Sequence, residues 1–133
     1  MNVLIAEDNK INSRIVAAVV EVLGDNPICK YDGRKALDYL LDNKNDYPDV
    51  IIADMYMPIM NGLELIKNVR EFDKNVSIIL YTANNELHNE EEYKKQKLDY
   101  LNISHFVPKG SGLNSLIDLL KTYSVNYREL RYK

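Results

Sequence analysis

The stretch Val50–Gly62 limits what this chain can fold into more than any other part of its sequence. It reads Val-Ile-Ile-Ala-Asp-Met-Tyr-Met-Pro-Ile-Met-Asn-Gly, so four apolar residues lead into a carboxylate, Asp54, and Pro and Asn-Gly follow. A short run that is apolar at every position predicts a strand covered on both faces, and Pro and Asn-Gly predict the turn that ends it. We therefore expect a buried strand over 50–54 that presents Asp54 at its carboxyl end.

The rest of the chain alternates short apolar runs with amphipathic stretches. A helix that begins after Asn9, a residue type that caps helices, and ends before Gly24, which tolerates a left-handed backbone, is the clearest example. Between the last strand and the last helix we expect a loop over Pro108–Gly112. The predicted strands cover 3–6, 27–31, 50–54, 76–82 and 105–107, and the predicted helices cover 10–23, 33–41, 62–72, a polar stretch within 83–102, and 113–131.

This alternation predicts the fold class. A chain of 133 residues with 46% hydrophobic content is long enough for one domain with a buried core, so we expect a single domain over 1–133. Strands that alternate with helices indicate parallel strands joined by right-handed crossovers, which form a doubly wound five-stranded α/β sheet. In such a sheet, ligands bind at the carboxyl ends of the strands.

Charge and composition argue against several classes of protein. The net charge is −3 and the basic residues are scattered, so we expect no direct nucleic-acid binding by this chain. The N-terminal stretch has no basic leader, and no apolar run approaches the length of a membrane span. We therefore expect a soluble, cytoplasmic protein without membrane contact.

Polar residues follow the predicted strands at the edge where ligands should bind: Glu7 and Asp8, Asp54, Thr82 and Lys109. Carboxylates brought together repel, since a pair about 4 Å apart costs about 4 kcal/mol at an effective dielectric constant of about 20. A cation must lie among them or a pKa must rise, and an all-oxygen site without a Cys/His cluster suits Mg²⁺ better than zinc. The Thr82 hydroxyl and the Lys109 ammonium supply a donor and a positive charge for an anion, which we infer to be a phosphoryl group.

These residues, in this order, resemble the receiver domain of two-component response regulators over essentially the whole chain. The resemblance implies a flavodoxin-like sheet with strand order 2-1-3-4-5 and five helices. It also implies a signalling switch rather than a turnover enzyme, one that takes a phosphoryl group onto Asp54 from a histidine kinase or a phosphotransfer protein. The set that carries the resemblance is Glu7-Asp8-Asn9, Asp54-x-x-Met57-Pro58-x-Met60-Asn61-Gly62, Thr82-Ala83 and Lys109.

The resemblance also implies a metal site. In it, Asp8 and Asp54 ligate Mg²⁺ directly, Glu7 does so through water, and the backbone carbonyl of Tyr56 completes the protein ligands. Tyr56 stands two residues after the phosphoacceptor, a position that tunes hydrolysis of the phosphoaspartate in the family. Its size suggests the hypothesis that it shields the acyl phosphate from water.

A phosphoryl site and a switch are implied in the same way. Thr82 and the backbone amide of Ala83 bind phosphoryl oxygens, and Lys109 pairs with another. Phe106, three residues before the lysine, is the switch aromatic that fills the space left when Thr82 moves towards the phosphoryl group. It replaces the tyrosine that is more frequent there, and so lacks a hydroxyl.

Two alternative functions stay open. Pro108-Lys109-Gly110 stands where the family has Lys-Pro, and this departure keeps open a receiver-fold interaction module that is not phosphorylated. The segment between Thr82 and Lys109 is also a few residues longer than is usual in the family. An aspartate-nucleophile phosphohydrolase is the other alternative, although Tyr56 stands where that class has a second acid.

Two further expectations concern partners. The opening Glu-Asp-Asn-Lys-Ile-Asn of 7–12 resembles the receivers of hybrid sensor kinases, whose first helix often begins with two such asparagines. A homodimer through the face formed by the fourth helix, the fifth strand and the fifth helix is a possible assembly in this family.

Overall fold

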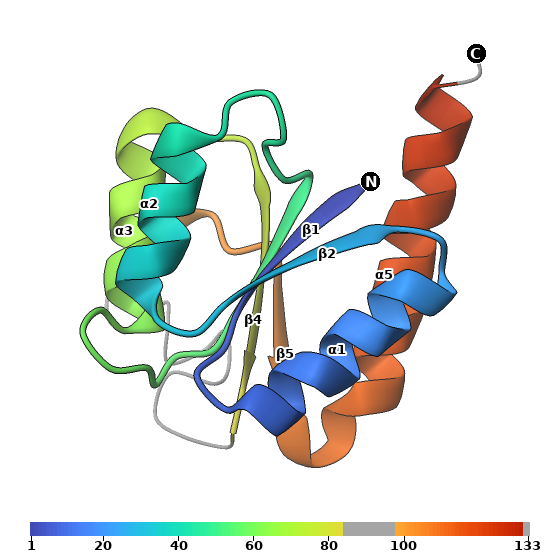
Figure 1. Ribbon diagram of the computed structural model, residues 1–133, viewed down its shortest axis with the longest axis horizontal. Coiled ribbons are helices and arrows are strands. Elements are labelled where there is room, and N and C mark those ends of the chain that lie inside the picture. The colour runs from blue at the N-terminus through green and yellow to red at the C-terminus, as the bar shows by residue number, and fades with distance from the viewer. Residues whose placement is uncertain (84–97, 132–133) are drawn as a thin grey trace.

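The computed structural model describes residues 1–83 and 98–131, in which five parallel strands form one central sheet (Figure 1). The strand order is β2-β1-β3-β4-β5, which confirms the predicted doubly wound α/β fold. Each predicted strand is found, with bounds shifted by one residue or not at all, and Asp54 follows directly after β3. The strands are β1 (Asn2–Ala6), β2 (Asn26–Lys30), β3 (Val50–Ala53), β4 (Ser77–Thr82) and β5 (His105–Pro108).

Helices cover both faces of the sheet. Those that the structure describes are α1 (Lys10–Val22), α2 (Gly33–Asp42), α3 (Gly62–Phe72), α5 (Lys109–Arg131) and the short 3₁₀ helix η1 (Asp99–Leu101). Most of the polar helix expected within 83–102 lies outside the described residues. Among the helices that are described, none has the length and apolar composition needed to cross a membrane.

Two apolar cores lie on either side of the sheet. Helices α2 and α3 pack on one face, while α1 and α5 pack on the other (Figure 1). Because successive residues of a strand point to opposite faces, β1, β3 and β4 contribute side chains to both cores. Each fully buried aliphatic side chain contributes about 1.5–3 kcal/mol, so these three central strands are the most strongly held part of the sheet. Their large aliphatic residues, each 0–2% exposed, are Val3, Leu4, Ile5, Val50, Ile51, Ile52, Ile78, Ile79 and Leu80.

Three helices begin on a capping side chain in the loop that follows the carboxyl end of a strand. The side-chain oxygens of Asn9, Asp32 and Asn61 accept hydrogen bonds from the backbone amides three residues further on, at 3.0, 2.7 and 2.8 Å. The predicted left-handed residue after α1 is confirmed, since Gly24 has a φ of +84°. The loops at this edge of the sheet are therefore anchored at the start of each following helix.

The prediction of a loop over Pro108–Gly112 is wrong. Pro108 is the last residue of β5, and α5 begins at Lys109, so the segment forms the first turn of a helix. One of the glycines that suggest a loop, Gly112, serves close packing instead. A Cβ on Gly112 would lie 2.8 Å from Cγ1 of Val107, so the missing side chain lets the first turn of α5 lie directly on β5.

Candidate functional site

The register of the sheet brings the predicted site residues to one edge. Ala6 of β1 pairs with Ala53 of β3, and the amide of Asp54 donates to the carbonyl oxygen of Ala6 at 2.9 Å. Glu7, one residue past β1, is therefore the lateral neighbour of Asp54. Thr82 ends β4 and Lys109 follows β5, so all four elements deliver a polar side chain to the same edge.

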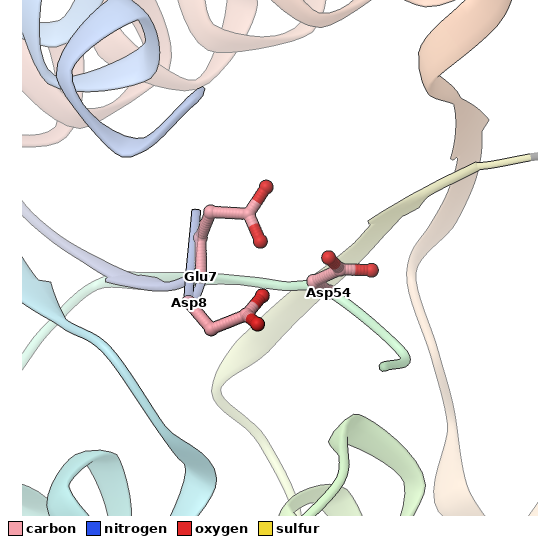
Figure 2. A group of neighbouring side chains, drawn as sticks. All are labelled: Glu7, Asp8 and Asp54. Atoms are coloured by element: carbon pink, nitrogen blue, oxygen red, sulfur yellow. The ribbon is translucent and has the colours of Figure 1, made fainter. Parts of the chain in front are cut away.

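Three carboxylates converge at this edge (Figure 2). Glu7 and Asp54 are 5% and 9% exposed and Asp8 is exposed, and each offers an oxygen atom within 4.8 Å of the others. Oε2 of Glu7 is buried and has no hydrogen-bond partner among the described residues. An all-oxygen set of this kind, with a buried oxygen left over, fits a hard divalent cation such as Mg²⁺.

Lys109 and Thr82 complete the surroundings of Asp54. The Lys109 ammonium bonds to Oε1 of Glu7 and, at 3.0 Å, to Oδ2 of Asp54. The Thr82 hydroxyl donates to Oδ1 of Asp54 at 2.7 Å, and the Tyr56 amide lies 3.4 Å from the same oxygen. Both oxygens of Asp54 thus accept from donors, and one of these donors carries a positive charge.

These contacts shift the pKa values of the two neighbouring acids, Glu7 and Asp54, in opposite directions. Burial and the adjacent carboxylate of Asp54 raise the pKa of Glu7 to about 7, and Lys109 only partly opposes this. Burial also raises the pKa of Asp54, but its contacts with Glu7, Thr82 and Lys109 outweigh burial, and the pKa lies below its ordinary value. The two pKa values therefore move in opposite directions, and Asp54 is the more acidic group of the pair.

The loop between β3 and α3 presses tightly on Asp54. The Gly62 amide donates to the carbonyl oxygen of Met55 at 2.8 Å, and a Cβ on Gly62 would overlap the backbone carbonyl of Asp54. The Gly33 amide donates to the Met60 carbonyl oxygen at 3.1 Å, which ties the same loop to the start of α2. What the sequence indicates as a turn is therefore a braced loop.

The other predicted residues take up less central places. The side chain of Tyr56 is about half exposed beside Asp54, and Ala83 is exposed directly after β4. Phe106 is half-buried, pairs with Leu80 in the sheet and packs against the core under α2 and α3. It lies on the same strand pair as Thr82.

Tyr81 is a site residue that the sequence interpretation misses. Its ring lies 5.8 Å from the Lys109 ammonium, and it packs with the core under α1 and α5. The available signal was an aromatic residue in an otherwise aliphatic strand, directly before Thr82. That signal has no meaning until Lys109 is placed on the first turn of α5.

Comparison with known sequences identifies similar proteins. A sequence model of the response regulator receiver domain matches residues 3–121. Hybrid signal transduction histidine kinase I of Dictyostelium discoideum is 29% identical over 133 residues, covering 96% of this chain and 7% of that protein. Sporulation initiation phosphotransferase F of Bacillus subtilis is 30% identical over 92 residues, covering 69% of this chain and 68% of that protein. The chain spans only 5–7% of the length of three histidine-kinase relatives. These are hybrid kinases I and K of Dictyostelium discoideum and peroxide stress-activated histidine kinase mak3 of Schizosaccharomyces pombe.

Solved structures show the same fold. The Francisella response regulator 1452 receiver domain superposes with a TM-score of 0.76 at 25% identity, covering 95% of this chain and 98% of that one. Vibrio cholerae chemotaxis protein CheY4 superposes with a TM-score of 0.74 at 25% identity, covering 91% and 96%.

Proposed function

The chain belongs to the response regulator receiver domain family, and on this premise we propose that Asp54 accepts a phosphoryl group from a histidine kinase or a phosphotransfer protein. The chain would then act as a switch in a two-component or phosphorelay system. The observation that carries the proposal is the surroundings of Asp54. Its carboxylate is buried, it accepts hydrogen bonds from Thr82 and Lys109, and two more carboxylates lie beside it.

Asp54 is suited to be the nucleophile. One of its oxygens attacks the phosphorus of phosphohistidine, so that an O–P bond forms while the P–N bond breaks and its electron pair leaves on the imidazole nitrogen. No general base is required because the lowered pKa leaves Asp54 without a proton. Phosphoryl transfer depends on positioning and charge stabilisation, and Lys109 brings a positive charge to within 3.0 Å of the carboxylate.

A divalent cation fits the proposal. Glu7, Asp8, Asp54 and the backbone carbonyl of Tyr56 would hold Mg²⁺, which when bound supplies further positive charge to phosphoryl oxygens. The convergence of the three carboxylates and the unpartnered Oε2 of Glu7 support this set.

The switch is proposed to run through Thr82. In this structure its hydroxyl donates to Oδ1 of Asp54. Once Asp54 carries a phosphoryl group, the hydroxyl would donate to a phosphoryl oxygen instead, and the backbone amide of Ala83 would donate to another. A move of Thr82 would open space that Phe106 fills, because Phe106 is half-buried on the neighbouring strand. A ligand shifts such an equilibrium only through contacts that differ between the two states, and Thr82 is the group whose contacts differ.

The setting of the switch is also a proposal. The similarity to hybrid kinase receivers supports a cytoplasmic partner that carries phosphohistidine. A homodimer through β5, α5 and the helix that the sequence predicts within 83–102 would pair two such switches, and size-exclusion chromatography with and without beryllofluoride tests it.

The central test is covalent labelling of Asp54. Incubation with Mg²⁺ and acetyl phosphate should add the mass of one phosphoryl group in a base-labile linkage. Asp54→Asn should abolish the adduct, whereas Asp46→Asn, at the opposite end of β3, should not. An absent adduct in the unaltered protein would favour an unphosphorylated interaction module, and steady turnover of phosphate esters would favour a phosphohydrolase.

Tyr56 is proposed to slow hydrolysis of the phosphoaspartate. Its ring is about half exposed, and its amide lies 3.4 Å from Oδ1 of Asp54, so the side chain stands at the edge of the site. After loading with a small phosphodonor, Tyr56→Ala should lose the phosphoryl group faster than the unaltered protein. Tyr100→Ala, which removes an exposed tyrosine from η1, is the control. Decay that is unchanged or slower in Tyr56→Ala would contradict the shielding role.

A further inference from the structure

Lys109 has an unusual task in this chain. It is the first residue of α5, and its long side chain must carry the ammonium back to Glu7 and Asp54. A lysine side chain has four rotatable bonds, so fixing it in one conformation costs conformational entropy. A positive charge in the first turn of a helix also meets the unfavourable end of the helix dipole. Something other than the helix must therefore favour the conformation that is seen.

An open alternative lies beside the lysine. A groove of about 270 Å³ runs between α1 and the start of α5, and Lys109 forms part of its wall. Asn12, Ile15, Val16, Tyr81 and Leu113 form the rest of it. An ammonium that turned into this groove would regain water and leave the carboxylates.

Tyr81 stands on the boundary between the groove and the acidic cluster. Its ring centroid lies 5.8 Å from the Lys109 ammonium, within the range of a cation–π contact. The ring is itself held in place, because Tyr81 pairs with Val107 in the sheet and packs with the core under α1 and α5. Close packing of Gly112 on Val107 brings the first turn of α5 down to this ring.

We propose that Tyr81 is a positioning residue that holds the Lys109 ammonium against Glu7 and Asp54 and away from the groove. Tyr81 acts through Lys109, and among the described residues no hydrogen bond joins Tyr81 to a carboxylate of the acidic cluster. Its effect on reaction rate rests on the proposed phosphoacceptor function, whereas its contact with Lys109 does not. The two parts are therefore tested separately.

The contact is tested by NMR without any phosphodonor. A group above an aromatic ring is shielded, so the Hε protons of Lys109 should resonate upfield of those of the exposed lysines. The shift should persist in Tyr81→Phe, which keeps the ring, and should vanish in Tyr81→Leu and in Tyr81→Met. The Leu and Met variants guard against one of them failing to fold. An unshifted Lys109 in the unaltered protein would overturn the proposal.

The rate is tested with acetyl phosphate and Mg²⁺. Tyr81→Leu should slow adduct formation by on the order of threefold to tenfold, the value expected from the loss of a partly desolvated cation–π contact. Tyr81→Phe should restore most of the rate. Tyr127→Leu removes a similar pair with Arg131, about 27 Å along the same helix, and should leave the rate unchanged.

A double-mutant cycle separates positioning from general destabilisation. In the Lys109→Met background, Tyr81→Leu should have no further effect on the rate, because the group that Tyr81 positions is gone. Effects that multiply would overturn the proposal. If the unaltered protein forms no adduct, the proposed function has failed, and the lysine resonance alone decides whether Tyr81 holds Lys109.

Discussion

Asp54 and Lys109 meet at 3.0 Å, yet the chain supports them in different ways. The backbone of Asp54 is enclosed: its amide bonds to Ala6, and Gly62 is pressed against its carbonyl group. Lys109 reaches the site from the first turn of α5, and its ammonium is held by side chains, those of the acidic cluster and Tyr81. Asp54, the proposed nucleophile, is therefore fixed by backbone packing, whereas the positive charge beside it is carried by a flexible side chain.

The difference has a practical consequence. Damage to the backbone around Asp54 should cost stability and chemistry together. Damage to the support of Lys109 should cost chemistry while the fold remains. Each of the following changes tests one side of this contrast.

Gly62→Ala should give the largest loss. A Cβ at this position would overlap the carbonyl oxygen of Asp54, so the backbone of the site must move. We expect a loss of about 3 kcal/mol in the free energy of unfolding, measured in urea. Gly110→Ala is the matched control, because a Cβ there meets no atom within 4 Å and α5 gains helix propensity. A loss in Gly62→Ala no larger than in Gly110→Ala would show that Asp54 is not enclosed as described.

Lys109→Met should affect the reaction and spare the fold. It keeps an unbranched side chain but removes the charge next to Asp54, so we expect adduct formation from acetyl phosphate to slow on the order of 100-fold, about 2.7 kcal/mol of activation free energy. Amide resonances over 55–62 should stay near their positions in the unaltered protein. Lys121→Met, which removes an exposed lysine from α5, should change neither measurement. Resonances of the whole loop that move with Lys109→Met would contradict side-chain support alone.

The same contrast explains how far the sequence could predict the site. Asp54, Glu7 and Thr82 lie at or directly after the carboxyl ends of strands, and strands that are apolar on both faces can be recognised as apolar runs in the sequence. The topology then brings their ends together without any knowledge of side-chain conformations. Backbone-fixed parts of the site were therefore predictable.

The parts that depend on packing were not. Gly110 and Gly112 indicate a loop by composition, yet α5 begins at Lys109 because the missing Cβ of Gly112 lets the helix rest on Val107. Tyr81 gained a meaning only through that placement. The sequence pattern alone does not show whether a glycine provides backbone flexibility or allows two segments of the chain to pack closely.

At the opposite edge of the sheet, the carboxylate of Asp73 is held both by backbone amides and by a side chain. Asp73 accepts from the amides of Asn75 and Val76, each at 2.9 Å, and from the Tyr47 hydroxyl at 2.7 Å. Burial raises its pKa, but these hydrogen bonds outweigh burial and lower the pKa below its ordinary value. A lowered pKa gives stability that is present above the unfolded-state value and is lost as the pH falls through the folded-state value.

Tyr47→Phe should therefore lose stability in a pH-dependent way. We expect a loss of about 1 kcal/mol near neutral pH, which shrinks in acid once Asp73 is protonated. Tyr39→Phe is the control, because its hydroxyl donates at 3.0 Å to the backbone carbonyl of Asp46, which does not titrate. Urea unfolding of both variants at about pH 6 and about pH 3 makes the comparison. Equal losses for Tyr47→Phe at the two pH values would mean that its bond to Asp73 does not carry the effect.

The smallest expected change tests how firmly the loop beyond Asp54 is braced. Ile59 has a φ of +71°, a conformation that is strained for a β-branched residue, and the Met60 amide donates to the Pro58 carbonyl oxygen at 2.7 Å across it. The side chain is 80% exposed, so hydrophobic burial of Ile59 offsets little of this strain. The strain persists because the loop is tied down on both sides of it, by Gly33 to Met60 and by Gly62 to Met55.

Ile59→Asn should stabilise the protein by about 0.5–1 kcal/mol, because asparagine adopts a positive φ at lower cost. If the braces and not Ile59 hold the loop, the rate of adduct formation at Asp54 should stay the same. Ile11→Asn, at a similarly exposed site in α1 without positive φ, should give no gain. A stabilised variant with an altered rate would mean that the strain at Ile59 helps to set the position of Asp54, and the enclosure of the nucleophile would then depend on one exposed side chain as well as on the backbone.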